Sequence, residues 1–227
     1  MKKFFYYLSL LAFLFVGINS CKKSDDRPIH YGYEYFGLET GRFVEYKVQY
    51  IVHDSLLNKH DTTNFFLKTV VGDQYIDNQG RTEYEFIRYK KDSLNGTYQF
   101  LHKWVAYLDS KHAELVEENQ RKVKLVFPIQ KNQIWDVNMY NMDGEQETHY
   151  STIDSSYQNP YFSTDSAVTV EFYRYKTLID DRLEQETYAP YIGMISKVSK
   201  ELYFQFGVAT PYKGTEMYYS IYSYGKN

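Results

Sequence analysis

Residues 43–53 alternate between apolar and polar side chains with a period of two, and this pattern constrains the fold more than any other feature of the chain. One side of the segment would carry Val44, Tyr46, Val48, Tyr50 and Val52. Alternation over this length is typical of a half-buried β-strand, because successive side chains of a strand point to opposite faces. No segment of the sequence shows the pattern of a convincing amphipathic helix of useful length. We therefore expect an all-β, antiparallel fold.

Segments of this kind recur at a spacing of about 8–12 residues and predict about a dozen strands. Polar loops are expected over residues 154–166 and 207–214. The ambiguous segment 113–120 is interpreted as a strand that enters a tight turn near Asn119. The strands would form either a curved half-barrel or a two-layer sandwich. They are predicted over residues 43–53, 62–71, 82–91, 98–109, 113–117, 122–127, 134–140, 145–153, 167–179, 183–189, 194–206 and 217–224.

The composition supports this fold class and excludes several kinds of site. The 26 tyrosines and 15 phenylalanines favour pleated, half-buried surfaces. The formal net charge is −3 and no long basic block is present, which argues against nucleic-acid binding. Cys21 is the only cysteine, so we expect no disulfide, no zinc–thiolate site and no cysteine nucleophile.

The first 21 residues have the layout of a secretory signal. Lys2 and Lys3 precede an apolar run over residues 4–16, which is too short to span a bilayer, and Cys21 follows shortly afterwards. A cysteine at this place can receive a diacylglycerol on its sulfur, and stable anchoring takes about two acyl chains. The alternative is an ordinary secretory signal with an incidental cysteine.

These residues resemble a bacterial lipoprotein signal peptide. Ile18 and Ser20 fit the motif before the cysteine, whereas Asn19 departs from it. The resemblance implies a signal peptide over residues 1–20 and a lipidated cysteine with a flexible tether over 21–34. Residues 24–26 (Ser-Asp-Asp) are similar to the export signal of surface lipoproteins in Bacteroidota-type bacteria, although a plain solvated linker is the alternative. The expected location is the outer membrane, lipid-anchored, facing the periplasm or the cell surface.

The remaining chain, residues 35–227, is expected to be a single domain with a weak internal repeat. Residues 36–46 match residues 127–137 in the order of aromatic, aliphatic and polar positions, with Gly41 and Asn132 in the same place. Both residue types tolerate a left-handed backbone. One interpretation is a duplication, with halves 36–126 and 127–227. The other is a recurrent strand-entry motif without duplication.

The same segments carry a second resemblance. Residues 35–46 and 127–135 look like the openings common in Bacteroidota-type lipoproteins of unknown function, and residues 186–195 are similar to a later strand entry of those proteins. Tyr191 replaces the glycine that is usual there. The resemblance implies an antiparallel β architecture, such as a half-barrel like that of the lipoprotein-sorting carriers. It implies no catalytic residue.

Catalytic and metal-binding patterns are weak. The sequence contains no nucleophile-elbow, zincin, P-loop or dinucleotide-binding motif. The pairs 53–54 and 60–61 (His-Asp) flank a probable hairpin turn and could bind zinc or copper, but four polar residues around an exposed loop are the favoured interpretation. Carboxylate pairs are interpreted as polar sides of amphipathic strands and comprise Glu83/Glu85, Glu145/Glu147 and Glu184/Glu186. We expect no enzyme activity, metal or cofactor.

Aromatic residues provide the remaining candidates. Tyr218, Tyr222 and Tyr224 are expected on one face of the last strand, where they would stack on sugar rings or, by the favoured alternative, form cross-strand ladders. Trp135 is predicted to be buried, the alternative being an exposed sugar-stacking platform. The expected function is a membrane-anchored binding or scaffolding module for a glycan or partner protein. The alternative is a half-barrel carrier of a hydrophobic ligand such as a lipid or a lipoprotein acyl chain.

Overall fold

The alternating segments pair with one another to form a single antiparallel sheet of twelve strands. The computed structural model describes residues 31–57 and 59–227, so the predicted signal peptide, Cys21 and most of the tether lie outside the described residues. The strands are β1 (Arg42–Asp54), β2 (Lys59–Ile76), β3 (Thr82–Lys91), β4 (Gln99–Leu108), β5 (His112–Glu117), β6 (Gln120–Val126), β7 (Ile134–Asp136), β8 (Glu147–Asn159), β9 (Phe162–Lys176), β10 (Asp180–Ala189), β11 (Gly193–Phe204) and β12 (Pro211–Lys226). The all-β, antiparallel prediction is confirmed.

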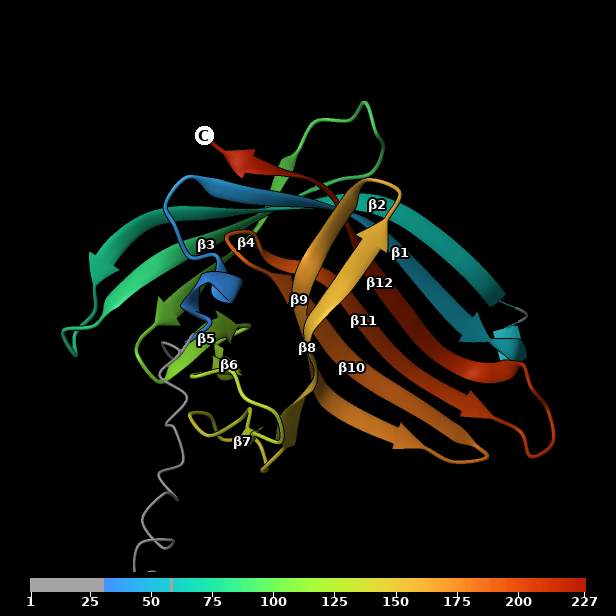
Figure 1. Ribbon diagram of the computed structural model, residues 1–227. Coiled ribbons are helices and arrows are strands. Elements are labelled where there is room, and N and C mark those ends of the chain that lie inside the picture. The colour runs from blue at the N-terminus through green and yellow to red at the C-terminus, as the bar shows by residue number, and fades with distance from the viewer. Residues whose placement is uncertain (1–30, 58) are drawn as a thin grey trace, which may run out of the picture.

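The order of strands in the sheet follows the order in the chain. Strands β1–β6 pair in sequence order, strands β7–β12 do the same, and β1 also pairs with β12, so that β6 and β7 form the two edges. The sheet is strongly curved, as Figure 1 shows, and the edges approach each other: the Val123 amide donates to the Val137 carbonyl at 2.9 Å. The result is a nearly closed barrel made of one sheet. The sandwich alternative, which needs two sheets, is not realised.

Two junctions close this barrel. We call the β1–β12 ladder the central seam, and the contact of β6 with residues 135–141 the closing seam. The segment before β1, with a short 3₁₀ helix η2 (Tyr33–Phe36), lies under the arch of the sheet (Figure 1). Among the described residues, no helix is long and apolar enough to cross a membrane.

Apolar side chains fill two clusters. One cluster gathers around the closing seam and η2, and includes Tyr35, Phe127, Trp135 and Tyr150. The other gathers around the central seam and includes Val44, Tyr46, Val48 and Ile221. Trp135 is 6% exposed, which confirms the prediction that it is buried.

Residues 154–166 are not a loop, and that prediction is wrong. Strands β8 and β9 continue through this segment and leave a tight turn at residues 160–161. The partly buried Tyr157 and Phe162 pack against the central-seam cluster. At the tip, the Asn159 side-chain amide donates to the Ser220 hydroxyl and the Ile221 carbonyl, both at 2.9 Å. Contacts with β12 therefore hold a polar segment in strand conformation.

Several strand boundaries also differ from the prediction; β2, for example, extends to Ile76 rather than to residue 71. Strand β7 ends at Asp136 rather than at residue 140, because the Asp136 carboxylate accepts hydrogen bonds from the amides of Asn138 and Gln146, both at 2.9 Å, and so forms a turn. Strand β12 begins at residue 211, inside the predicted loop 207–214.

Left-handed residues mark several turns as expected. Glu118 and Asn119 both have positive φ, and they link β5 to β6 in the predicted hairpin. Gly41 (φ 86°) and Asn132 (φ 64°) share the left-handed backbone that the repeat requires. Tyr191 also has a positive φ (62°), so the turn keeps the conformation that suits the usual glycine. The duplication itself stays a prediction.

Candidate functional site

A cavity of about 220 Å³ lies inside the curved sheet, between the first and the second half of the barrel. Its walls come from strands β1–β5 and β10–β12. Apolar and aromatic side chains predominate, with a few charged groups among them. The lining residues are Tyr46, Thr69, Phe86, Arg88, Trp104, Leu115, Glu117, Glu186, Tyr188, Met194, Lys197, Met217 and Tyr219.

One wall carries a network of buried charges, which we call the lysine–glutamate cluster. Its members are Glu117, Lys124, Glu184, Glu186 and Lys197. Lys124 Nζ lies 2.6 Å from Glu117 and 3.0 Å from Glu186. Lys197 Nζ lies 2.9 Å from Glu186 and 3.1 Å from Glu184. Buried charges are tolerated when they are paired in this way, because isolation from water costs several kcal/mol for each unpaired ion.

The cluster keeps its members ionised. Burial by itself would raise the pKa of Glu186, but the charges of Lys124 and Lys197 outweigh it and hold that pKa well below the usual range. Burial likewise opposes the charge of each lysine, and the neighbouring glutamates outweigh it, so the pKa values of Lys124 and Lys197 are raised. Tyr188 donates its hydroxyl to Glu186 as well. Glu186 therefore accepts from three donors at once.

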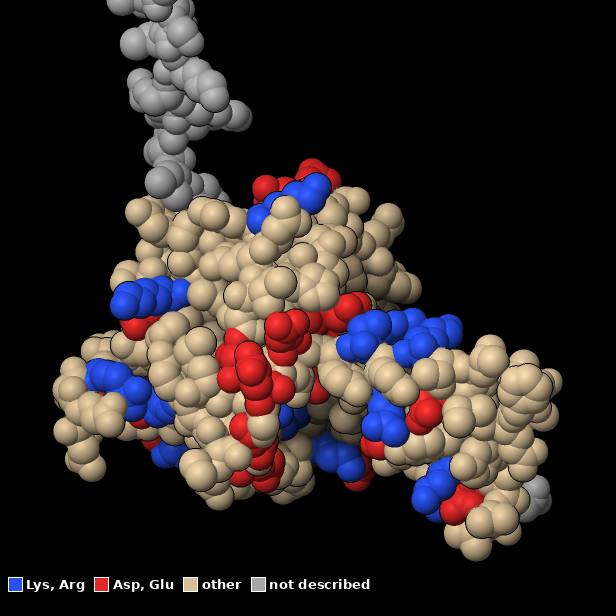
Figure 2. Space-filling model, turned by 90° about the horizontal axis from the view of Figure 1, so that it is seen from below, with Lys and Arg blue, Asp and Glu red and all other residues tan. Residues whose placement is uncertain are grey.

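The sequence does not predict this cluster. The two-residue spacing of Glu184 and Glu186 predicts the polar side of an amphipathic strand, whereas the structure places Glu186 in the interior at 3% exposure. The sequence does hold one signal: Lys124 stands between Val123 and Leu125, and all three are buried. Lys124 directly precedes the apolar residues 125–127, and a lysine is fully buried in such a place only when it is paired. Seen from below, Asp and Glu side chains gather in a band beside Lys and Arg side chains (Figure 2).

Arg88, on β3, provides a further charge in the cavity. Its guanidinium lies over the Trp104 ring, 4.0 Å from the ring centroid, and Nη2 donates to the Tyr219 hydroxyl at 3.2 Å. The residue is 8% exposed, and Nε has no hydrogen-bond partner among residues 31–57 and 59–227. The cavity therefore has aromatic walls, the cation Arg88, and the lysine–glutamate cluster, whose charges are paired with one another.

The three tyrosines of β12 do not share one face, and that prediction is wrong. Tyr46 pairs with Ile221 but Glu45 pairs with Ser223, so that Tyr222 is the extra residue of a β-bulge. The extra residue shifts the alternation by one position. Tyr218 consequently lies opposite Gln49, on the outer face, whereas Tyr224 lies opposite the buried Val44.

All three rings have protein contacts. Tyr222 contacts Phe66 and Tyr161, with centroid distances of 5.7 Å and 5.1 Å. Tyr224 contacts Phe162 at 5.6 Å, and Lys200 lies over Tyr218 at 5.4 Å. Strand β12 pairs with β1 and β11, whereas the aromatic partners Phe66, Tyr161 and Phe162 lie on β2 and in the β8–β9 hairpin, so these contacts are not the predicted cross-strand ladder. Sugar stacking by these residues stays a prediction.

Of the two His-Asp pairs at the first hairpin, the structure brings the two histidines together. His53 and His60 are direct cross-strand partners, with 3.3 Å between their Nδ1 atoms. His53 Nε2 lies 3.0 Å from Glu216, while Asp54 accepts the backbone amides of residues 56 and 57. Within the described part of the chain, no group of three or more His, Cys, Asp or Glu could hold a metal ion.

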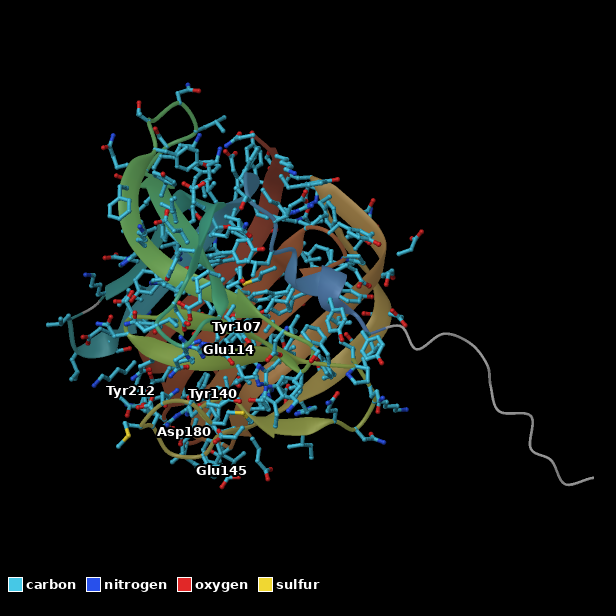
Figure 3. The ribbon with its side chains drawn as sticks, turned by 90° about the vertical axis from the view of Figure 1, so that its left-hand side faces the viewer. Tyr107, Glu114, Tyr140, Glu145, Asp180 and Tyr212 are labelled. Atoms are coloured by element: carbon cyan, nitrogen blue, oxygen red, sulfur yellow. The ribbon has the colours of Figure 1, made fainter. Side chains whose placement is uncertain are left out.

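A second charged group lies at the closing seam, and Figure 3 shows it from the side, with Tyr107 on β4, Glu114 on β5 and Tyr140 after β7. Glu114 is 2.6 Å from Arg121 and 3.1 Å from His112 Nδ1. His112 Nε2 lies 2.9 Å from the Tyr140 hydroxyl. The nearby Glu114 carboxylate raises the pKa of His112, against the opposing effect of burial. This group connects the sheet edge to the segment that follows β7.

Comparisons with known proteins identify no family for this chain. No protein-family model matches the sequence, and no curated protein matches it. One solved structure resembles the chain, a Bacteroides fragilis protein described as exported and as having a YmcC-like fold. The TM-score is 0.47 and the identity is 13%, over 85% of this chain and 99% of that one. A resemblance of this degree carries no information about ligand or activity.

Proposed function

We propose that this chain is a cell-envelope lipoprotein, anchored through Cys21 to the outer membrane, that binds a small amphipathic molecule inside its barrel. The observation that carries the proposal is the cavity of about 220 Å³. Apolar walls with a few convergent polar groups are the usual make-up of a small-molecule site. The envelope location rests on the sequence of residues 1–21 alone.

Binding is favoured over catalysis by the state of the carboxylates in the cavity. Glu186 accepts from Lys124, Lys197 and Tyr188, and its lowered pKa keeps it ionised at neutral pH. A general acid or base needs a pKa near the working pH and a free position toward the substrate. The cluster offers neither at Glu186. We therefore propose a protein without enzyme activity.

The size of the cavity favours a small ligand. Ligand pockets usually measure about 300–1,000 Å³, and this cavity is smaller. Its volume equals that of about seven water molecules at roughly 30 Å³ each. A ligand of the size of a six-carbon acid or a single aromatic ring fits this space, whereas a complete acyl chain of a lipid does not.

Filling the cavity tests the proposed site. Met217 lines the cavity and Met142 is fully exposed, so Met217→Trp and Met142→Trp form a matched pair. We expect hexanamide, a neutral amphipathic probe, to show saturation-transfer NMR signals with the parent protein and with Met142→Trp, and to lose them with Met217→Trp. Over-packing costs about 1–3 kcal/mol, so circular dichroism should verify that the variant folds. Equal signals with all three proteins would contradict the proposal, as would the absence of binding by the parent of both hexanamide and its charged analogue hexanoate.

The proposed anchor has its own test. Cys21→Ala removes the sulfur that would receive the diacylglycerol, so labelled palmitate should no longer be incorporated and the protein should leave the membrane fraction. Ser20→Ala, which keeps a small residue before the cysteine, is the control and should still be labelled. Membrane retention and labelling of Cys21→Ala would refute the anchor without affecting the cavity.

A further inference from the structure

Three arginines in the described part of the chain have a buried Nε without a hydrogen-bond partner: Arg42, Arg88 and Arg182. Arg42 forms an ion pair with Glu39, and Arg182 forms one with Asp180 at 3.2 Å. Arg88 has no carboxylate partner among residues 31–57 and 59–227. It is therefore an arginine whose charge is buried without a counter-ion, and it lines the cavity.

The surroundings of Arg88 hold its guanidinium in place without neutralising it. Trp104 contacts one face of the group, and Tyr219 accepts one of its five N–H bonds. Cation–π contacts and a neutral hydroxyl compensate only part of the several kcal/mol that it costs to bury an ion. An anion next to Arg88 would supply the missing compensation.

The charges on the facing wall do not supply it. Glu117, Glu184 and Glu186 are paired with Lys124 and Lys197, and none of these three carboxylates lies within ion-pair distance of Arg88. Three carboxylates against two ammonium groups leave this wall with one excess negative charge. An anionic ligand would be repelled by the cluster and attracted by Arg88, so the cavity defines the direction in which such a ligand binds.

We infer that the ligand of this cavity is a small organic anion, with its carboxylate bound by Arg88 and its apolar part held against Trp104, Phe86 and Leu115. The inference rests on the proposed function, because it names the chemistry of the ligand in the same cavity. A guanidinium binds a carboxylate through two parallel N–H···O bonds, which a lysine cannot reproduce. The three apolar residues are cavity-lining neighbours on β3, β4 and β5.

A pair of nearly isosteric probes tests this inference. Hexanoate and hexanamide differ in charge and share the same chain length, and binding of each is measured by saturation-transfer NMR and by the emission of Trp104. The chain has only two tryptophans, so Trp104→Phe identifies the contribution of the cavity. With the parent protein, we expect hexanoate to bind about tenfold to a hundredfold more tightly than hexanamide, as a charge-assisted hydrogen bond implies.

Substitution of the arginine should abolish that preference. Arg88→Met should weaken hexanoate to the level of hexanamide, and Arg88→Lys, which keeps the charge but loses the paired geometry, should lie between. Arg182→Met is the matched control, because Arg182 also has a buried Nε but has a carboxylate partner and does not line the cavity. It should bind both probes as the parent does.

The outcomes separate this inference from the proposed function. If the parent binds both probes equally, the anion inference is overturned while cavity binding stands. If neither probe binds, both fail. If Arg88→Met does not fold, the two probes are compared on the parent and on Arg88→Lys alone. A preference for hexanoate that is undiminished in Arg88→Lys would overturn the role of Arg88.

Discussion

The two seams of the barrel are built in different ways. The central seam pairs all thirteen residues of β1 with β12 through a continuous register that one bulge interrupts. The closing seam has one backbone hydrogen bond, between Val123 and Val137, and depends otherwise on side chains. Trp135 Nε1 donates to the Val123 carbonyl at 3.1 Å, and the Asn141 amide donates to the Arg121 carbonyl at 2.9 Å.

This difference has a consequence for mutation. A ladder of backbone hydrogen bonds is available to every strand-forming sequence, because each residue supplies the same donor and acceptor. A junction made by individual side chains depends on their identity. Single substitutions should therefore open the closing seam and leave the central seam paired.

Replacement of Trp135 should have the largest effect. Trp135→Ala removes a buried aromatic ring and a hydrogen bond, and should lower the free energy of unfolding by about 3–5 kcal/mol of a typical total of about 5–15 kcal/mol. Urea unfolding followed by circular dichroism measures this loss. Trp135→Phe, which keeps a ring and loses the N–H donor, should cost less.

Hydrogen exchange locates the damage caused by Trp135→Ala. The Val123 amide reports on the closing seam, and the amide of Val48, which lies on β1 opposite Tyr219 of β12, reports on the strand that forms the central seam. We expect Val123 to lose more protection than Val48. An equal loss at both amides would show that the two seams form one cooperative unit, and the contrast between them would be wrong.

Replacement of Asn141 should have an intermediate effect. Asn141→Ala removes the hydrogen bonds to the Arg121 carbonyl and to Asn138, and should cost about 1–2 kcal/mol. Asn159→Ala is the control, because the Asn159 amide also donates to a backbone carbonyl but does so at β12. Only Asn141→Ala should speed exchange of the Val123 amide. Faster exchange at Val123 in both variants would contradict the assignment of Asn141 to the closing seam.

The smallest effect is expected from pH, through His112. The adjacent Glu114 carboxylate raises the pKa of His112, with burial opposing and Asp109 adding to the rise, so the folded state binds the proton more tightly than the unfolded chain. The resulting stabilisation is complete below the unfolded pKa of about 6.5, and it is lost as the pH rises through the higher folded pKa. One charge-assisted pair amounts to about 1 kcal/mol.

Thermal unfolding at pH 6 and pH 9 measures this contribution. The parent should lose more stability on going to pH 9 than His112→Gln does. His149→Gln serves as the control, because the His149 side chain is half exposed and lies 3.9 Å from its nearest carboxylate. If His112→Gln and the parent respond alike to pH, His112 does not stabilise the closing seam in its charged form.

The strands could be predicted because they depend on local alternation. Val44, Tyr46 and Val48 are buried at every second position, as the pattern requires. The prediction failed where distant contacts decide. Residues 154–166 became strand because Tyr157 and Phe162 pack against the central-seam cluster and Asn159 bonds to β12.

The candidate site could be predicted only in fragments. Alternation places Arg88 and Thr69 on strand faces but does not tell which face encloses a cavity, since β3 carries polar residues on both sides. The bulge at Tyr222 leaves no mark in the sequence that separates it from a regular strand, and yet it decides that Tyr224 lies on the other face. Pairing of Lys124 with Glu186 joins residues 62 positions apart, which no local pattern contains.

The central seam also determines how the chain reaches its fold. Ten of the eleven strand pairings join neighbours in sequence, whereas the eleventh joins β1 to β12 and pairs Arg42 with Lys226, 184 residues further along. Closing a loop of this length costs about 3 kcal/mol more conformational entropy than closing a hairpin. The hairpins can therefore form early, and β1 keeps an unpaired edge until β12 arrives. Folding speed is expected to be limited by this one long-range encounter, and the exposed edge of β1 is where partly folded chains would associate.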